Sequence, residues 1–342
     1  MTEGVPDSTQ GMSESLVEQL GVSENVRLSE QLVSEAIGLV TDAPDTLDFK
    51  IATAALTEMR AAFKVFAPYK HERKVSIFGS ARTEPDDPLY AQARDLAARL
   101  AERGWMTVTG AGPGIMEAGM EGAGRERSIG VSIRLPFESG ANSVIAGDEK
   151  HIAMKYFFTR KLMLIKESHA FVCLPGGFGT LDETFELLTL MQTGKGLPVP
   201  VVLLDEPGDP YWESVDELVE SQLAARGLVS ANDRSLYTIT DSCDVACEVI
   251  ERFYSNYDSI RFVGDRLVIR LRQAPSDEQL ASLNERYGHL VASGSIQRSE
   301  ATRAERRDGD KLDLERISFD FTKHGYGDLI SMIGDINAWL DR

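Results

Sequence analysis

The chain has 342 residues, of which 42% are hydrophobic and 26% charged, and its formal net charge at pH 7 is −18. This length suits one large domain with additions, and the composition is that of a globular protein with a substantial core. A surface with this much negative charge repels nucleic-acid backbones and anionic membranes. We therefore expect neither as a partner.

Targeting segments and metal sites are not expected either. No run approaches the roughly 18 uncharged apolar residues of a membrane span, and the acidic start lacks the features of a signal peptide. The three cysteines are too few for a disulfide framework and lack the paired spacing of a zinc site. We therefore expect a cytoplasmic protein with reduced thiols and no metal.

The first part of the chain is expected to be helical. Residues 1–12 are polar and are interpreted as a disordered tail. Apolar residues then recur at helical spacing from about Ser13 to Val40 and from Leu47 to Phe66, and Pro68 ends the second stretch. Residues 13–68 are thus predicted to form a helical extension.

From Lys74 onward, short apolar strands alternate with helices. The expected strands are Val75–Phe78, Met106–Thr109, Ile129–Leu135, Ala170–Leu174, Val199–Leu204 and Tyr237–Ile239. The expected helices are Pro88–Arg103, one ending at Glu126, Lys150–Glu167, one ending at Thr193, Tyr211–Ala225 and Ser242–Tyr254. This alternation predicts an α/β domain over residues 69–258, with a parallel sheet covered by helices on both faces.

The pattern changes after about residue 258. The expected elements are a strand at Arg266–Arg272, a helix at Ser276–Val291, strands at Gln297–Arg306 and Leu314–Phe321, and a helix at Tyr326–Leu340. This order predicts a small α+β accessory domain at 259–342, for which a ferredoxin-like arrangement is one candidate. We interpret it as an interaction or ligand-sensing module, and the Arg298–Arg307 stretch as a solvated strand edge rather than a nucleotide contact.

Three of the expected strands end in loops of small residues: Gly79-Ser80-Ala81, Gly110–Gly114 and Gly176–Thr180. In an open parallel sheet such loops lie at the carboxyl ends of the strands, where ligands bind. The N–H groups that start the helix after Pro175, with the Thr180 hydroxyl, would converge on an anion. A single loop of this kind is more often only a turn, but three at one edge predict a mononucleotide site.

The kind of nucleotide site is also constrained. No GK[ST] follows these loops, so they are not a P-loop. The Gly110–Gly114 string departs from GxGxxG, and no acidic residue ends the next strand, which argues against a dinucleotide cofactor.

Two charged positions are candidates for chemistry. Glu183 follows the third loop by one helical turn; it could cap its helix, or stabilise the positive charge that develops when a glycosidic bond breaks. Arg160 and Lys161 could form a solvated helix face. They interrupt an apolar stripe, however, so at least one is expected to point to a specific partner such as a phosphate or a leaving base.

These residues resemble the LOG (lonely guy) family. Pro175–Glu183 is similar to its PGGxGTxxE signature, and Arg160-Lys161 to the basic pair that precedes it. Gly79–Arg82 and Gly112–Glu117 resemble its first and second loops, and the stretch from Ser128 through Leu135-Pro136 to Asn142 is similar to the longer bacterial members. The resemblance covers roughly residues 70–255.

The resemblance implies a modified Rossmann-like fold, a homodimer or larger homo-oligomer, and no metal or organic cofactor. It also implies N-glycosyl hydrolase activity, which converts nucleoside 5′-monophosphates (AMP-like or cytokinin riboside monophosphates) to free base and ribose 5-phosphate. Arg160 and Glu183 would be the catalytic pair. The residues expected to bind the nucleotide are Gly79, Ser80, Gly110, Gly112, Gly114, Met116, Glu117, Lys161, Gly176, Gly177, Gly179 and Thr180.

Two alternatives stay open. One is a carrier of a nucleotide or of the molybdenum cofactor that holds phosphate without cleavage; it would not require the Arg160 and Glu183 pair. The other is a nucleic-acid-processing protein, against which the net charge counts. Lysine decarboxylase, an old label of many members, needs a Schiff-base lysine and an acidic partner for its cofactor, and no segment is arranged for either.

Overall fold

The computed structural model describes residues 7–42, 44–134 and 140–340. The chain divides into two compact units, residues 1–60 and 61–342. No helix in the described part of the chain is long and apolar enough to cross a membrane.

The first unit is helical. It contains α1 (Asp7–Gln19), α2 (Val26–Thr41) and most of α3 (Thr46–Phe66), which continues across the division. Ser13 and Val17 are buried on one face of α1, which packs on α2. Because α1 begins at Asp7, the expectation of a disordered tail is wrong for residues 7–12. Residues 1–6 lie outside the described residues.

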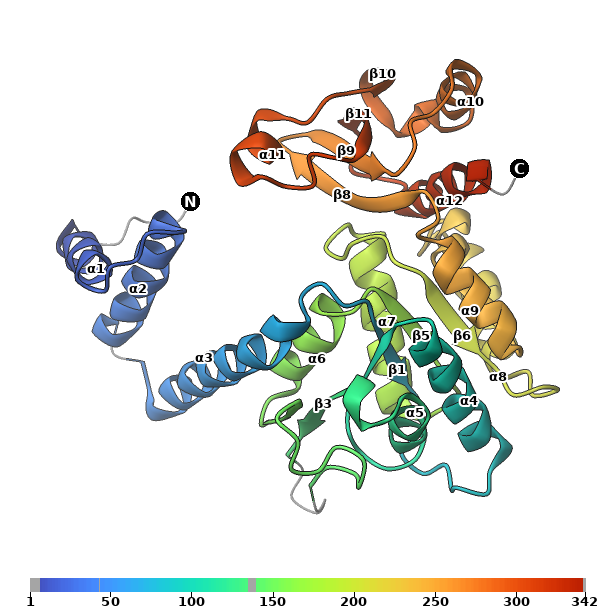
Figure 1. The fold of residues 1–342 in the computed structure, drawn as a ribbon, viewed down its shortest axis with the longest axis horizontal. Coiled ribbons are helices and arrows are strands. Elements are labelled where there is room, and N and C mark those ends of the chain that lie inside the picture. The colour runs from blue at the N-terminus through green and yellow to red at the C-terminus, as the bar shows by residue number, and fades with distance from the viewer. Residues whose placement is uncertain (1–6, 43, 135–139, 341–342) are drawn as a thin grey trace. The chain divides into compact units, whose positions relative to one another are not determined.

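The second unit is built on a seven-stranded parallel sheet in the order β4-β3-β2-β1-β5-β6-β7. Strands β1, β3, β5 and β6 of this sheet are labelled in Figure 1. Its strands are β1 (Lys74–Phe78), β2 (Met106–Thr109), β3 (Ser128–Ile133), β4 (His151–Met154), β5 (Ala170–Cys173), β6 (Val201–Leu204) and β7 (Thr238–Thr240). The central strands are buried along their whole length, as expected for a sheet with two covered faces. The predicted Rossmann-like α/β fold is confirmed.

Helices cover both faces of this sheet. They are α4 (Pro88–Glu102), α5 (Ile115–Ala123), α6 (Phe157–Lys166), α7 (Phe178–Gln192), α8 (Tyr211–Leu218) and α9 (Cys243–Arg252). The face that carries Val75 and Val172 packs against α4, α5 and α9, and the face that carries Ser76 and Phe171 packs against α6 and α7. The chain changes direction between β1 and β5, so the loops after these strands flank a topological switch point.

One expected helix is partly a strand. Residues 151–154 form β4, which pairs in parallel with β3, and the helix begins only at Phe157. Ile152 and Met154 are buried while His151 and Ala153 are half-buried, so burial alternates with the period of a strand. The expected strand Ile129–Leu135 ends at Ile133 in the structure, and Leu135 and Pro136 lie outside the described residues.

The accessory domain has a four-stranded antiparallel sheet in the order β10-β11-β9-β8. Its elements are β8 (Tyr257–Val263), β9 (Arg266–Leu271), α10 (Asp277–Tyr287), β10 (Val291–Arg298), α11 (Arg303–Asp308), β11 (Glu315–Phe321) and α12 (Tyr326–Asn337). The two leading strands give an order that differs from a ferredoxin-like fold. The expected strand Gln297–Arg306 is also wrong: β10 ends at Arg298, and Thr302 caps α11 through a reciprocal bond with Glu305.

The accessory domain packs on the sheet domain without a solvent layer. One continuous hydrophobic core includes Val172 of the parallel sheet, Tyr257 and Ile333. Ser235 donates to the carbonyl oxygen of Gly327 (2.7 Å), and the Tyr326 ring packs against Gly194 just beyond the end of α7. The two domains are therefore one folded unit.

Candidate active site

The three glycine loops meet at the switch point of the parallel sheet. The Ser80 N–H of the first loop donates to the carbonyl oxygen of Pro175 in the third loop (3.3 Å). The Ser80 carbonyl accepts from the N–H of Ile115, which follows the second loop (3.0 Å). Ser80 thus holds the three loops together, and the sequence prediction that they share one edge agrees with this geometry.

The third loop ends in an open helix terminus. Helix α7 has Gly177 as its N-cap residue, and no side chain caps this end in the described structure. The first N–H groups of a helix have no acceptor within the helix, so this end favours an anion. A Cβ atom on Gly176 would lie 2.2 Å from Thr180 Oγ1, so the close approach of this hydroxyl to the loop requires glycine.

Arg160 points into the site rather than toward solvent. It lies on α6 with only 8% of its surface exposed. Its Nε donates to the carbonyl oxygen of Val131 (3.0 Å), and its Nη1 donates to Oε1 of Glu183 (2.8 Å). The guanidinium lies directly against the second loop. A Cβ atom on Gly110 would be 2.2 Å from Nη2, so this position requires glycine.

Glu183 is the acidic partner in this pair. Its side chain is largely buried on α7, and it does not cap the helix, so the structure does not support that alternative. Burial raises the pKa of this carboxyl group above its ordinary value, although Arg160 and Lys161 act in the opposite direction. The pair is thus a weakly solvated ion pair one helical turn from the open end of α7.

The second loop is held in an unusual conformation. Ala111 has a positive φ of 56°, and its N–H donates to the Thr109 hydroxyl (3.0 Å). The Asn142 side chain donates to the carbonyl oxygen of Gly112 (3.0 Å). The thioether of Met116 lies beside the loop, where a Cβ atom on Gly110 or Gly112 would meet it.

Two of the expected nucleotide-binding side chains have other partners. Lys161 forms ion pairs with Asp182 and Glu186, each at 2.7 Å, so its ammonium group is held along α7. Glu117 accepts a hydrogen bond from Ser143 (3.1 Å). The structure therefore brings together the loops, Arg160 and Glu183, and gives Lys161 and Glu117 protein partners.

Sequence reasoning missed one side chain that touches the third loop. The Tyr211 hydroxyl donates to the carbonyl oxygen of Gly176 (2.6 Å), from 35 positions further along the chain. No local motif marks this residue, because its partner is a backbone atom that only the fold brings near.

No metal site is apparent. Across the described ranges, no group of three or more His, Cys, Asp or Glu side chains could hold a metal ion.

Part of this chain is similar in sequence to known proteins. A family model described as "Possible lysine decarboxylase" matches residues 108–250. The "Probable cytokinin riboside 5'-monophosphate phosphoribohydrolase LOG4" of Oryza sativa subsp. japonica is 28% identical over 176 residues, which are 50% of this chain and 73% of that protein. The corresponding LOG6 of Arabidopsis thaliana is 33% identical over 133 residues, 37% of this chain and 65% of that protein. The chain is therefore similar to LOG proteins over about half of its length. This confirms the resemblance seen in the sequence motifs.

Solved structures show a weaker likeness. The molybdenum cofactor carrier protein from Chlamydomonas reinhardtii is 19% identical, covers 53% of this chain and 98% of its own, and superposes with a TM-score of 0.36.

Proposed function

We propose that this LOG relative hydrolyses the N-glycosidic bond of nucleoside 5′-monophosphates and releases free base and ribose 5-phosphate. The observation that carries the proposal is the buried pair of Arg160 and Glu183 beside the uncapped start of α7. A site that only binds a nucleotide does not need a carboxylate whose pKa is raised by burial.

The 5′-phosphate would bind at the start of α7. The N–H groups of the third loop point outward from the helix end, and the helix dipole favours a negative charge there. Each hydrogen bond to a charged group contributes roughly 1.5–3 kcal/mol, so a few of them fix the phosphate. Ribose, attached to that phosphate, would then lie next to Glu183.

In the bond-breaking step, the bond between C1′ and the base nitrogen breaks and its electron pair leaves with the base. Positive charge develops on the ribose, and the Glu183 carboxylate stabilises it. Water forms the new bond to C1′ and loses a proton, for which a carboxylate with a raised pKa is a suitable acceptor. The leaving base gains a proton in turn, so that the free base is released. Nη2 of Arg160, which faces Gly110, would donate to the phosphate or to the leaving base.

The relatives support this substrate class. Both plant proteins named above carry the name cytokinin riboside 5′-monophosphate phosphoribohydrolase. We extend to this chain the class of nucleoside 5′-monophosphates, with AMP and cytokinin riboside monophosphates as its first members to test, and we place the reaction in the cytoplasm.

We also propose that the working unit is a homodimer or a larger homo-oligomer. Helix α6 directs Arg160 inward and exposes Phe157, Phe158 and Leu162, which are each about half exposed. Beside them lies a cavity of about 580 Å³, lined mainly by apolar side chains of α6 and α7. A second copy of the chain would cover this face with the same residues in a two-fold interface. A Leu162→Glu variant should lower the molar mass in light scattering; an unchanged mass would contradict this interface.

The proposed reaction is tested by chromatography of the purified protein with 5′-monophosphates, the matched nucleosides and the 3′-monophosphates. We expect base release from the 5′-monophosphates only, because the phosphate positions the ribose. Binding of AMP without release of adenine would contradict hydrolysis and favour the carrier.

A further inference from the structure

The carbonyl group of Gly176 is oriented by a side chain from outside the signature motif. Tyr211 is the first residue of α8, and its hydroxyl donates to this carbonyl at 2.6 Å. The same Gly176 lies under the Thr180 hydroxyl and close to the Ser80 N–H, so its backbone is at the centre of the loop contacts.

The direction of this carbonyl also sets the direction of the next N–H group. The C=O of Gly176 and the N–H of Gly177 belong to one planar peptide and point in opposite directions. When Tyr211 holds the carbonyl, the Gly177 N–H is turned the other way. If the peptide flipped, a carbonyl oxygen would replace this donor at the helix terminus, and it would repel a phosphate. Two successive glycines offer little resistance to such a flip.

Tyr211 is well placed to hold this peptide because it is itself anchored to the sheet. Its ring packs edge-on against Trp212, with ring centroids 4.9 Å apart. Trp212 is fully buried, and its backbone N–H donates to both carboxylate oxygens of Asp205 (3.0 and 3.1 Å), just after β6. Burial raises the pKa of Tyr211, so its hydroxyl keeps its proton at neutral pH.

We propose that Tyr211 is a positioning residue that orients the Gly176–Gly177 peptide for binding of the 5′-phosphate. The inference deepens the proposed function and rests on it for the identity of the ligand. Tyr211 would not contact the substrate; it would act through the peptide.

The test compares Tyr211→Phe, which removes only the hydroxyl, with Tyr237→Phe as a matched control. Tyr237 donates its hydroxyl to Asp216 (2.6 Å), so the control also loses one part-buried tyrosine hydrogen bond, but not at the loop. We expect Tyr211→Phe to raise the KM for AMP and the Kd for ribose 5-phosphate about tenfold, the loss of one hydrogen bond to a charged group. The kcat should change much less, and the affinity for free adenine should not change.

A second variant, Asp205→Asn, keeps one acceptor for Trp212 and should raise the same two constants by a smaller factor. If Tyr211→Phe folds and binds ribose 5-phosphate as the wild type does, the inference is wrong. If the wild type releases no base but Tyr211→Phe weakens ribose 5-phosphate binding, the proposed reaction fails and the positioning role stands. If Tyr211→Phe hydrolyses AMP with an unchanged KM, the proposed reaction stands and the positioning role of Tyr211 is wrong.

Discussion

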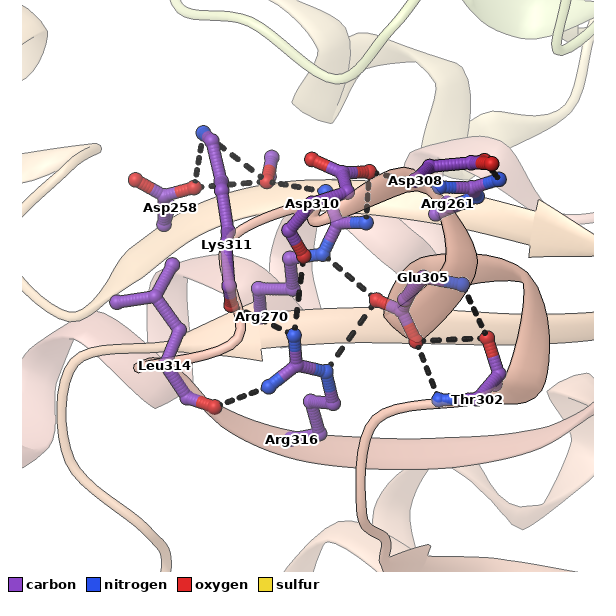
Figure 2. A network of polar contacts seen from close by, with 11 residues as sticks. Asp258, Arg261, Arg270, Thr302, Glu305, Asp308, Asp310, Lys311, Leu314 and Arg316 are labelled. Carbon is purple, nitrogen blue, oxygen red and sulfur yellow. Dashed lines mark hydrogen bonds and ion pairs between the residues drawn. The ribbon is translucent and has the colours of Figure 1, made fainter.

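Arginine and glutamate meet in two buried clusters within the described residues. In the sheet domain Arg160 meets Glu183, and in the accessory domain Arg270 and Arg316 both meet Glu305. Figure 2 shows the second cluster, in which α11 is held on the sheet by these contacts. The residues are alike, yet the pKa values of the two carboxyl groups are shifted in opposite directions.

Both carboxylate oxygens of Glu305 accept two hydrogen bonds each. This residue has no exposed surface; its Oε1 accepts from Nε of Arg270 (2.9 Å) and Nε of Arg316 (3.2 Å), and its Oε2 accepts from the N–H (2.8 Å) and hydroxyl (2.9 Å) of Thr302. Burial alone would raise its pKa, but these hydrogen bonds outweigh burial and lower the pKa to about 2.

Glu183 has fewer donors, and burial prevails, so its pKa is raised. A buried carboxylate with every lone pair satisfied therefore serves the structure, whereas one left partly unsatisfied is available for chemistry. The two clusters therefore predict opposite responses to the same substitution.

The largest effect is expected for Glu183→Gln. Removing the charge that stabilises the ribosyl cation should lower kcat by about a thousandfold. The free energy of unfolding should stay the same or rise, because the amide has no charge to desolvate. The matched control is Glu186→Gln, one turn along the same helix, which should retain most of the activity. Chromatographic rates and urea unfolding of each variant check both parts.

Glu305→Gln should lower the stability of the protein and leave its activity nearly unchanged. It removes the carboxylate that two buried guanidinium groups share, although Arg270 keeps its ion pair with Asp310. The free energy of unfolding should therefore fall by about 3 kcal/mol, while kcat stays within about twofold. Urea unfolding followed by circular dichroism measures the first quantity. A large loss of activity in a variant of normal stability would contradict the division of roles.

The two clusters should also respond to pH in different ranges and through different quantities. The pKa of Glu305 is about 2 in the folded protein and 4.5 ordinarily, so its contribution to stability is complete above about pH 5 and is lost as the pH falls toward 2. The stability difference between wild type and Glu305→Gln should therefore shrink only on the acid side. Because the Glu183 pKa is raised, kcat should fall below a pKa that lies above 4.5. A rate that is flat down to pH 4.5 would contradict that pKa.

The smallest effect is expected for Lys161→Met. Its two partners Asp182 and Glu186 are partly exposed, and ion pairs of partly exposed groups contribute about 1 kcal/mol. The KM for AMP should rise less than about threefold. A rise above tenfold would show instead that Lys161 binds the nucleotide, as the sequence motif predicts.

The parallel sheet was predictable because strands buried on both faces are continuous apolar runs with glycine loops at one edge. Arg160 and Glu183 were predictable as a pair because each belongs to a motif. β4 was not, because four residues of alternating burial are too few to separate a strand from the start of α6. Neither the acidic partners of Lys161 nor the bond of Tyr211 to Gly176 could be predicted, since both depend on side-chain direction in the folded chain.

Hydrolysis of the N-glycosidic bond by Glu183 is tested most directly by analysing the products of AMP incubated with the wild type and with Glu183→Gln in parallel. We expect adenine and ribose 5-phosphate in equal amounts from the wild type, with no adenosine or inorganic phosphate, and almost none of either product from the variant. Release of inorganic phosphate, or equal adenine release by the two proteins, would contradict it.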